Sequence, residues 1–322
     1  KTEMLNEEQL AEYQTNKELD YTLSLAGVGR FRVNFFRQRG TDSFVVRQIV
    51  STIKTLSELN LPPILAELAL KERGLVLVVG STGSGKSTTL AAMINHRNAN
   101  KSGHILTLED PIEFLHPHKK SLVNQREVGH DTLSFNRALK SALREAPSVL
   151  LVGEIRDREA MESALNFSET GHLVFSTLHA TNTSQTIDRI LSFYDRSEQD
   201  LAQMQLSQNL LAIVAQRLIP MENGKLTAAL EILVSTARIK DLIQKGSIDL
   251  LPVAIKSGAS ESMQLFDQAL YTLYKEKKIS EMTAIDSADH PTDLKLMISS
   301  TEQREPSQEI NLLDDDNESH ED

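Results

Sequence analysis

A run of glycine, hydroxyl and lysine side chains at residues 80–87 has the types and spacing of a phosphate-binding loop. Gly80, Gly85, Lys86 and Ser87 occupy the four fixed positions of the pattern G-x-x-x-x-G-K-[ST]. Glycines let the backbone turn its N–H groups inward around a polyphosphate. The lysine then reaches the β- and γ-phosphates, and the serine hydroxyl ligates Mg²⁺. The predicted nucleotide-binding residues are Gly80, Ser81, Thr82, Gly83, Ser84, Gly85, Lys86, Ser87 and Thr88.

The segments on either side of this P loop (residues 80–87) support the same interpretation. An apolar run at residues 75–79 predicts a buried strand, and residues 88–93 predict the first turns of a helix. A phosphate-binding loop requires this order of strand, loop and helix. The alternative, a glycine-rich turn that binds nothing, does not need all four fixed positions together with both flanks. The sequence therefore predicts a nucleotide site that includes Mg²⁺.

Acidic side chains follow a second predicted strand. The segment Glu109-Asp110-Pro111-Ile112-Glu113 comes directly after the strand-like run at residues 105–108. Ligands of open α/β sheets bind at the carboxyl ends of the strands. Carboxylates there can hold Mg²⁺ through water or take a proton from an attacking water. Alone, the segment could be an acidic loop; beside a P loop, the functional interpretation is preferred.

Two more predicted strands end in residues that can do chemistry. The apolar strand at residues 149–152 is followed by Gly153-Glu154, the pattern of a Walker B strand with glutamate in place of the commoner aspartate. His179 follows the strand at residues 173–177, where it can hydrogen-bond a γ-phosphate or a catalytic carboxylate. His172, across the same strand, is the candidate for a structural histidine. We expect Glu154 and His179 to face the same site as the P loop.

The elements that precede this region predict a small α+β unit. Residues 1–18 have helical character, with Asn6 and Gln9 spaced as a capping pair. Three strand-like runs follow, at residues 21–25, 30–37 and 44–53. In the second run, apolar side chains alternate with Arg30 and Arg32, so one face is apolar and the other presents guanidinium groups.

From residue 74 onward, strand-like and helix-like runs alternate, which predicts a mostly parallel sheet covered by helices on both faces. A hairpin turn is predicted at residues 222–224, and the chain becomes helical after residue 235. The fold class is therefore α/β. The predicted order is an N-terminal domain (residues 1–55), a linker (56–73), a nucleotide-binding domain (74–300) and a disordered acidic tail (301–322).

Composition limits the classes of protein that remain. The chain has 322 residues, 40% hydrophobic and 25% charged, as in folded globular proteins. No apolar run is long enough to span a bilayer and the first residues lack a signal-peptide pattern, so we expect a cytoplasmic protein. The chain begins with Lys1 rather than Met, and we expect that it starts inside a longer gene product or has been trimmed. The lack of cysteine excludes disulfides, a thiol nucleophile and Cys-ligated metals.

The negative charge is concentrated at the end of the chain. Residues 301–322 hold nine acidic residues against one arginine, which accounts for −8 of the formal net charge of −11. The rest of the chain is nearly neutral. Nucleic-acid binding needs clustered positive charge, so we expect no nucleic-acid partner, and a DNA-translocating ATPase is the less favoured alternative. The tail has little apolar surface to bury and is predicted to be disordered.

In order, the four clusters resemble the Walker A, Asp, Walker B and His boxes of the type II/IV secretion ATPases. These boxes are residues 80–87, 107–113, 152–157 and 170–179. The segment Arg-Phe-Arg-Val-Asn at residues 30–34 also resembles the signature of that family's N-terminal domain. The likeness runs from about Tyr21 to Ile298, which is nearly everything except the acidic tail.

Within the family, the chain is most similar to the type IV pilus retraction ATPases, the PilT/PilU branch. Assembly-type members carry a four-cysteine zinc motif, which this chain cannot form. Residues 237–243 resemble the A-I-R-N-L-I motif of the branch, with Arg238 and Asp241 as departures. Ala146-Pro147 stands where the PilT type usually has Asp-Pro. The segments 263–270 and 293–298 are more similar to the accessory PilU type.

This resemblance implies a RecA-like P-loop ATPase domain preceded by a small PAS-like α+β domain whose beginning is missing. It implies ATP hydrolysis that drives pilus retraction and twitching motility, in a homohexameric ring at the cytoplasmic face of the inner membrane. The implied partners are the related main retraction ATPase and the inner-membrane pilus platform protein. The alternative within the same family is an accessory nucleotide-dependent regulator or scaffold with weak activity of its own.

The resemblance also implies roles for single residues. Glu113 is the carboxylate that activates water, and Ser87 and Glu154 hold Mg²⁺, partly through water. The arginines stabilise phosphate charge from the N-terminal domain, across a domain or subunit boundary. The predicted catalytic residues are Glu113, Glu154, His179, Arg30, Arg32 and Arg47.

Overall fold

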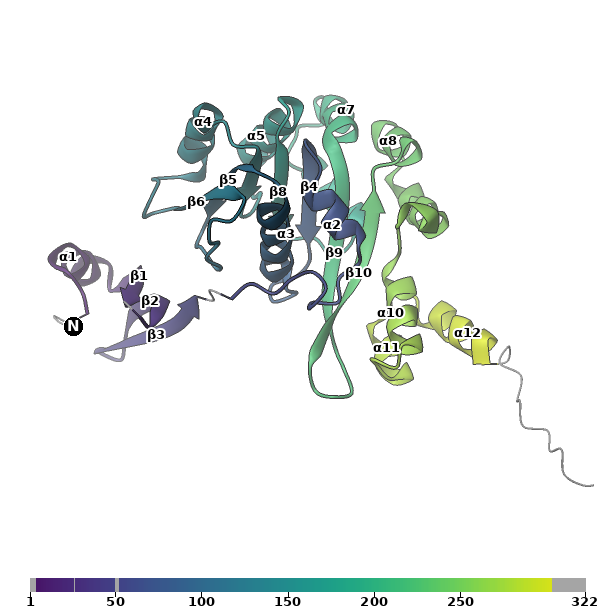
Figure 1. The fold of residues 1–322 in the computed structure, drawn as a ribbon, viewed down its shortest axis with the longest axis horizontal. Helices are drawn as coiled ribbons and strands as arrows, with labels where there is room; N and C mark the ends of the chain where they lie inside the picture. The colour runs from purple at the N-terminus through teal and green to yellow at the C-terminus, as the bar shows by residue number, and fades with distance from the viewer. Residues whose placement is uncertain (1–3, 26, 50–51, 303–322) are drawn as a thin grey trace, which may run out of the picture.

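The computed structural model of the chain describes residues 4–25, 27–49 and 52–302. The described elements form two sheets, a three-stranded sheet near the N-terminus and a seven-stranded sheet in the body of the molecule (Figure 1). The predicted acidic tail lies outside the described residues from residue 303 onward, and the predicted domain boundaries stay predictions.

A helix and an antiparallel meander make up the N-terminal unit. These elements are α1 (Glu7–Asn16), β1 (Glu18–Leu25), β2 (Gly29–Gln38) and β3 (Thr41–Ile49). The middle strand, β2, pairs antiparallel with both neighbours. Asn6 and Gln9 form the predicted capping box at the start of α1. Tyr13 of α1 joins Val33 and Phe35 of β2 in a small core.

The third strand lies earlier in the chain than predicted. It runs from Thr41 to Ile49, whereas Thr52 and Ile53 are not in a strand, so the prediction of a strand at residues 44–53 is wrong at both ends. Arg39 and Gly40, with φ values of 49° and 79°, form a two-residue hairpin turn. Positive φ at both positions suits the twist of a tight hairpin, so pairing begins directly after the turn.

The larger sheet has the strand order β10-β9-β4-β8-β7-β5-β6. Its strands are β4 (Gly74–Val79), β5 (Gly103–Glu109), β6 (Ser121–Glu127), β7 (Val149–Val152), β8 (Leu173–Leu178), β9 (Leu210–Pro220) and β10 (Leu226–Val234). Only β9 and β10 pair antiparallel within this sheet, through the predicted hairpin turn, so the prediction of a mostly parallel sheet is confirmed. The edge strand β6 is not among the predicted strands, because polar residues interrupt its apolar pattern.

Helices cover both faces of this sheet (Figure 1). In chain order they are α2 (Ile64–Ala69), α3 (Lys86–Asn100), α4 (Phe135–Glu145), α5 (Arg158–Glu169), α6 (Thr183–Leu191) and α7 (Gln199–Asn209). Successive residues of β4 point to opposite faces, so Leu77 packs in one core with Met161 of α5 and Val78 packs in the other with Met93 of α3. Every residue of β4 is buried as a result.

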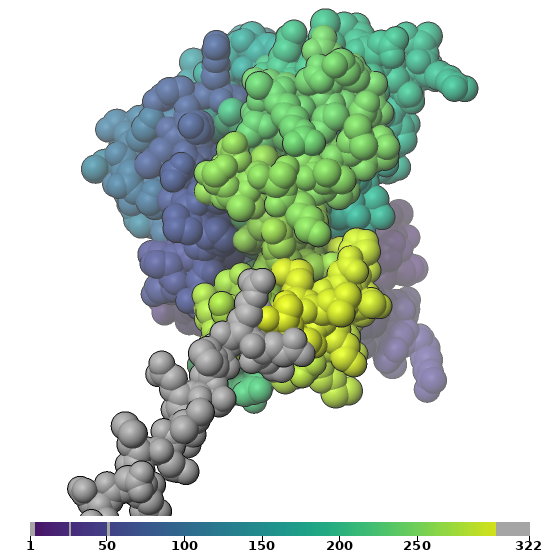
Figure 2. Space-filling model, turned by 90° about the vertical axis from the view of Figure 1, so that its right-hand side faces the viewer, coloured from purple at the N-terminus to yellow at the C-terminus, as the bar shows by residue number. Residues whose placement is uncertain are grey.

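The chain ends in helices, as the sequence predicts. They are α8 (Ala237–Gln244), η1 (Ile248–Leu250), α9 (Leu251–Ser257), η2 (Ala259–Glu261), α10 (Phe266–Lys275), α11 (Glu281–Ser287) and α12 (Pro291–Glu302). Their green-to-yellow surface faces the viewer in Figure 2. Arg217 of β9 holds this part, because its Nη1 lies 2.8 Å from Asp289 Oδ1 and its guanidinium lies 4.0 Å above the Phe266 ring. In the part of the chain that the structure describes, no helix combines the length and apolarity needed to span a bilayer.

Candidate nucleotide site

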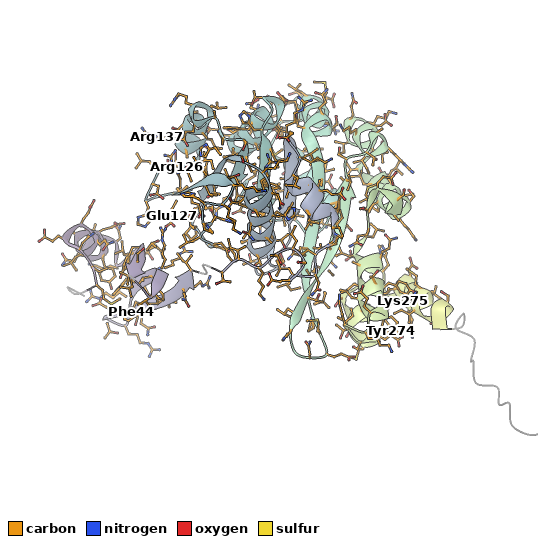
Figure 3. The ribbon with its side chains drawn as sticks, viewed as in Figure 1. Phe44, Arg126, Glu127, Arg137, Tyr274 and Lys275 are labelled. Carbon is orange, nitrogen blue, oxygen red and sulfur yellow. The ribbon has the colours of Figure 1, made fainter. Side chains whose placement is uncertain are left out.

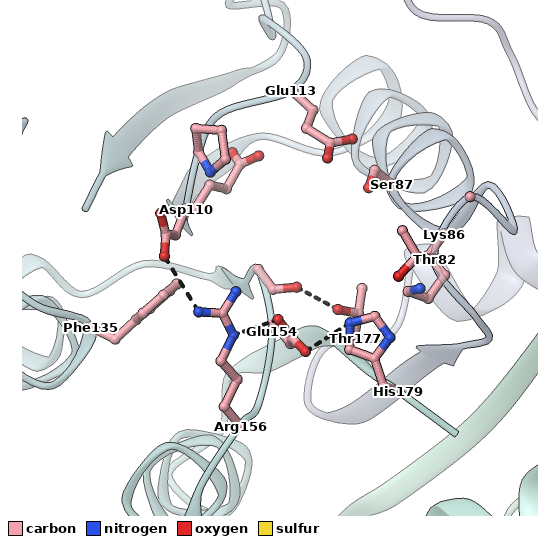
Figure 4. A pocket seen from close by; sticks show the side chains of 14 residues that line it. Thr82, Lys86, Ser87, Asp110, Glu113, Phe135, Glu154, Arg156, Thr177 and His179 are labelled. Carbon is pink, nitrogen blue, oxygen red and sulfur yellow. Dashed lines mark hydrogen bonds and ion pairs between the residues drawn. The ribbon is translucent and has the colours of Figure 1, made fainter. Parts of the chain in front are cut away.

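The carboxyl ends of β4, β5, β7 and β8 surround a cavity of about 260 Å³, the nucleotide cavity (Figure 4). Parallel strands end at the same edge of a sheet, and these four are neighbours, so the clusters predicted separately meet there. The predicted site residues that line the cavity are Thr82, Gly83, Lys86, Ser87, Glu113, Glu154 and His179.

Two positions of the P loop leave no room for a side chain. Gly80 and Gly85 have φ values of 151° and 89°, which L-residues rarely adopt. A Cβ on Gly80 would lie 2.5 Å from the Gln216 carbonyl oxygen, and one on Gly85 would lie 2.7 Å from Gln216 Nε2. The loop therefore passes directly against β9. It leads into the start of α3, where helix N–H groups attract anions.

Lys86 covers the P loop from the cavity side. Its ammonium group donates hydrogen bonds to the carbonyl oxygens of Gly80 (2.8 Å) and Ser81 (2.9 Å). Burial lowers the pKa of Lys86, while the negative charges of Glu154 and Glu113 act in the opposite direction. A phosphate in the cavity would add negative charge and raise the pKa of Lys86 further. The charged lysine and a bound anion therefore stabilise each other.

Glu154 is held from two sides. Its Oε1 lies 3.0 Å from His179 Nε2, and its Oε2 lies 2.6 Å from Arg156 Nε. Arg156 continues the chain of contacts, with Nη1 3.5 Å from Asp110 Oδ2 (Figure 4). The Glu154 side chain is only 18% exposed. This carboxylate therefore connects the ends of β7 and β8 and, through Arg156, the segment after β5.

The two glutamates of the segment after β5 have different surroundings. Glu109 is partly buried and accepts hydrogen bonds from Thr107 Oγ1 (2.6 Å) and Gln125 Nε2 (3.2 Å), and burial raises its pKa. Glu113 is exposed, and its carboxylate lies near Ser87 in the cavity (Figure 4). A carboxylate open to the cavity can take a proton from water, whereas Glu109 is already bonded to its neighbours.

The oxygen groups of the cavity suit Mg²⁺. In the described ranges, no three His, Asp or Glu side chains cluster so as to hold a metal ion by themselves. The Ser87 hydroxyl and the carboxylates of Glu113 and Glu154 nevertheless face one cavity. Mg²⁺ in nucleotide sites keeps several waters and takes one or two protein oxygens together with phosphate oxygens, which this sparse set can supply.

The three N-terminal arginines predicted to be catalytic lie outside the nucleotide cavity in the single chain. Arg30 Nη2 is 3.8 Å from Glu127 Oε2, at the end of β6. Arg32 borders a second cavity, of about 300 Å³, between the N-terminal unit and the larger sheet, and Arg47 lies opposite Arg32 in the strand register. Asp110 borders both cavities, so its segment stands between these arginines and the P loop. Contact of the arginines with phosphate stays a prediction.

Two other residues singled out in the sequence lie away from this cavity. Thr88 borders a hollow of about 590 Å³ on the other side of the P loop, between residues 54–61 and the β9–β10 hairpin. His172 Nδ1 lies 3.1 Å from both Thr170 Oγ1 and the Phe167 carbonyl oxygen, and its ring packs edge-on against Phe167. These contacts fit the structural role proposed for His172.

Gln216 of β9 is a site residue that no sequence motif reveals. Its side chain accepts a hydrogen bond from Thr89 Oγ1 (2.7 Å) and donates one to the Ser84 carbonyl oxygen (2.8 Å). It therefore joins the P loop to the first turn of α3. The position follows from the parallel pairing of β4 with β9, which brings Ala215 opposite Val79 at the start of the loop. Sequence patterns do not report such pairings between distant segments.

Comparisons with known proteins agree with this geometry. Residues 22–282 match the model of the family described as Type II/IV secretion system protein. The chain is 49% identical to the type IV pilus ATPase PilU of Pseudomonas aeruginosa, over 92% of this chain and 78% of the relative. It is 44% identical to the type IV pilus retraction ATPase PilT of the same organism, over 90% of this chain and 84% of the relative.

A solved structure also matches. The crystal structure of the pilus retraction motor PilT with bound ADP superposes with a TM-score of 0.85 at 42% sequence identity, covering 92% of this chain and 84% of that one. The residues matched by the family model include the P loop, the acidic segment after β5, Glu154 and His179.

Proposed function

The chain belongs to the family of type II/IV secretion system proteins and is a pilus-related ATP hydrolase, and from this premise we propose that its ATP hydrolysis drives retraction of a type IV pilus. The observation that carries the proposal is the meeting of Lys86, Ser87, Glu113, Glu154 and His179 in one cavity. A P loop binds phosphate, and the three residues opposite it supply the proton acceptor and polar contacts that hydrolysis needs.

The proposed substrate position follows from the two hollows beside the P loop. The triphosphate of ATP lies in the nucleotide cavity, with its β- and γ-phosphates at Lys86. The nucleoside lies toward Thr88, in the hollow on the other side of the loop. Ser87 and Glu154 are the residues that would hold Mg²⁺, Glu154 through water. When bound, this ion neutralises charge on the β- and γ-phosphate oxygens.

Glu113 is the proposed proton acceptor for the attacking water. It is open to the cavity, whereas Glu154 already bonds to His179 and Arg156. His179 lies where it can contact the γ-phosphate, so loss of that phosphate would change the hydrogen bonding of Glu154. The cavity therefore has separate groups for accepting the proton and for registering that hydrolysis has occurred.

The N-terminal arginines are proposed to act after a movement of domains or from a neighbouring subunit. Arg30, Arg32 and Arg47 lie on the face of a small sheet separated from the P loop by the Asp110 segment. Closure of that sheet over the nucleotide would add positive charge where the transition state needs it. In a homohexameric ring, closure of one subunit after another would convert hydrolysis into mechanical work.

We further propose that the ring lies in the cytoplasm against the inner membrane, where it acts on the pilus platform protein together with the main retraction ATPase. An accessory role beside that motor is the second candidate. It is favoured by the identity of 49% to PilU, against 44% to PilT, from one organism. The rate of ATP hydrolysis by the chain alone and mixed with PilT separates the two, because an accessory subunit should be slow alone.

Complementation tests the proposal. In a piliated strain that lacks its own copy of this gene, the wild-type gene should restore twitching and pilus retraction seen by fluorescence microscopy. Glu113→Gln should produce the same amount of protein without restoring retraction. The proposal is contradicted if retraction and twitching are normal without the gene, or if the Glu113→Gln gene restores them fully. The mass of the purified protein with ATP analogue, by native mass spectrometry, tests the hexamer.

A further inference from the structure

A buried carboxylate outside the nucleotide cavity contacts both parts of the molecule. Glu127 is the last residue of β6, the edge strand of the larger sheet, and is 4% exposed. Figure 3 shows it on the side of that sheet that faces the N-terminal unit. Burial of a carboxylate is costly unless hydrogen bonds and charges compensate it, so its partners are informative.

The two oxygens of Glu127 have partners from both parts. Oε1 accepts a hydrogen bond from Thr22 Oγ1 of β1 at 3.1 Å, and His130 Nε2 lies 3.8 Å from it. Oε2 accepts a hydrogen bond from the Ile112 backbone N–H at 3.2 Å and lies 3.8 Å from Arg30 Nη2 of β2. Ile112 immediately precedes Glu113. One side chain therefore links the N-terminal sheet to the segment that carries Glu113.

The backbone around Glu127 fixes where this side chain starts. Its N–H donates to Asp131 Oδ2 at 2.8 Å, and the next residue, Val128, donates its N–H to the Glu109 carbonyl oxygen at 2.9 Å. The ends of β5 and β6 are thus tied together below the side chain. Movement between the N-terminal unit and the larger sheet must therefore change the contacts of the Glu127 carboxylate and leave the strand end in place.

We propose that Glu127 is a positioning residue that ties the placement of the N-terminal unit to the position of the Glu113 carboxylate. Thr22 holds Oε1 and Arg30 lies beside Oε2, and Oε2 also accepts from the Ile112 N–H, so Glu113 faces Ser87 while the unit is docked. When the unit leaves, the buried carboxylate loses partners and the Ile112 segment loses its fixed acceptor. This inference rests on the proposed role of Glu113.

The contact with Arg30 is suited to exchange. Its ion pair with Glu127 is long, at 3.8 Å, and Arg30 Nε is buried without a hydrogen-bond partner within the described residues. An unsatisfied buried donor favours any movement that offers it an acceptor. Phosphate oxygens within reach would supply the acceptor that the Arg30 Nε–H lacks, so exchange of Glu127 for phosphate is favourable for Arg30.

Three substitutions distinguish a positioning role of Glu127 from a role in folding. Glu127→Leu removes both carboxylate oxygens, and the leucine side chain is of similar size. Glu127→Gln keeps a neutral network, because its amide oxygen can accept from the Ile112 N–H and its NH₂ can donate to the Thr22 hydroxyl. Thr22→Val removes only the hydroxyl of the N-terminal unit. The matched control is Glu145→Leu, which removes a carboxylate that pairs at 3.0 Å with Arg126, the neighbour of Glu127 on the strand.

The measurements are kcat for ATP, ADP affinity by fluorescence titration, and thermal unfolding. Glu127→Leu should lower kcat about 10-fold or more, because a misplaced catalytic group costs this much, and change ADP affinity less than about 3-fold. Glu127→Gln should recover most of the kcat. Thr22→Val should lower kcat about 3-fold in the wild-type background and have no further effect in Glu127→Leu, because the link is already broken.

Three outcomes would overturn the inference. One is a kcat for Glu127→Leu equal to that of Glu145→Leu. Another is a Thr22→Val effect of equal size in both backgrounds. The third is a loss of ADP affinity and of stability in Glu127→Gln as large as in Glu127→Leu, which would make the role structural. If Glu113→Gln itself hydrolyses ATP at the wild-type rate, the proposed function of Glu113 fails instead, whatever the Glu127 variants do.

Discussion

The strands that form the nucleotide cavity and the strands of the N-terminal sheet differ in how firmly they are held. β4 lies in the middle of a sheet covered on both faces, and all six of its residues are buried. β3 is the edge of a three-stranded sheet, and Phe44, Val45 and Val46 on it are about half exposed. The cavity is therefore built on a rigid support, while the N-terminal sheet is held by fewer contacts.

This difference assigns separate tasks to the two regions. Segments that follow firmly packed strands suit groups that must hold phosphate and water in fixed geometry, such as Lys86 after β4 and Glu113 after β5. A lightly held sheet suits groups that arrive and leave, such as Arg30, whose ion pair in the single chain is long. Substitution of Lys86, which faces the phosphates, should therefore lower both nucleotide binding and turnover, whereas substitution of Arg30 should lower turnover alone.

The largest effect is expected at Lys86. Lys86→Ala removes the charge that faces phosphate in the cavity, so hydrolysis should be lost and ADP affinity should fall about 100-fold. Fluorescence titration with labelled ADP measures the affinity, and circular dichroism controls for folding. A variant that binds ADP like the wild type would remove the distinction between the two regions.

Arg30→Ala should lower kcat by about 10²-fold or more and leave ADP affinity within about 3-fold, because its charge acts on the transition state when the N-terminal sheet closes. Arg37→Ala is the matched control, since Arg37 lies near the other end of β2 and donates to the Gly40 carbonyl oxygen. Equal losses of kcat in both variants would mean that the sheet matters as a whole and Arg30 has no special place.

One valine in β4 and one in β3 test whether the two strands differ in how much their packing stabilises the protein. Val78→Ala in β4 removes methyl groups from a fully buried site and should lower the free energy of unfolding by about 2 kcal/mol. Val46→Ala in β3, at 45% exposure, should cost about 0.5 kcal/mol or less. Chemical denaturation measures both. Similar costs would show that the N-terminal sheet is more firmly packed in solution than its exposure indicates.

The smallest expected effect is a loss of folding stability at acidic pH. Burial lowers the pKa of His116, near the segment that carries Glu113, to about 4, against 6.5 in the unfolded chain. The unfolded state therefore binds a proton first, so stability should fall as the pH drops below about 6.5 and level off below about 4. Between pH 7 and 5 we expect a loss of about 1–2 kcal/mol. Denaturation of His116→Gln should lack this part of the pH dependence.

Sequence patterns predict the rigid region well because its chemistry sits at strand ends. The apolar runs at residues 75–79, 105–108, 149–152 and 173–177 all lie within strands of one sheet. Since neighbouring parallel strands end together, assigning the strands also brings the P loop, Glu113, Glu154 and His179 together. The meeting of these strand ends could thus be predicted, whereas the contribution of Phe135 to the cavity could not, and the roles of the residues stay predictions.

What could not be predicted depends on pairings between distant segments. Gln216 reaches the P loop only because β9 lies beside β4, and Glu127 reaches Ile112 and Thr22 only because β6 closes the edge of the sheet. In β6, polar residues also weaken the apolar pattern, whereas β9 is apolar from Leu210 to Ala215 but its pairing partner is not written in its own sequence. The position of Arg30 depends on how two sheets meet, which local sequence does not encode.

ATP hydrolysis and ADP binding measured together on Glu113→Gln test the central claim most directly. The claim is that Glu113 takes the proton from water in a cavity whose phosphate-binding side is complete without it. The predicted result is a kcat at least about 100-fold below the wild-type value with ADP affinity unchanged. A Glu113→Gln variant that hydrolyses ATP at the wild-type rate would contradict the account.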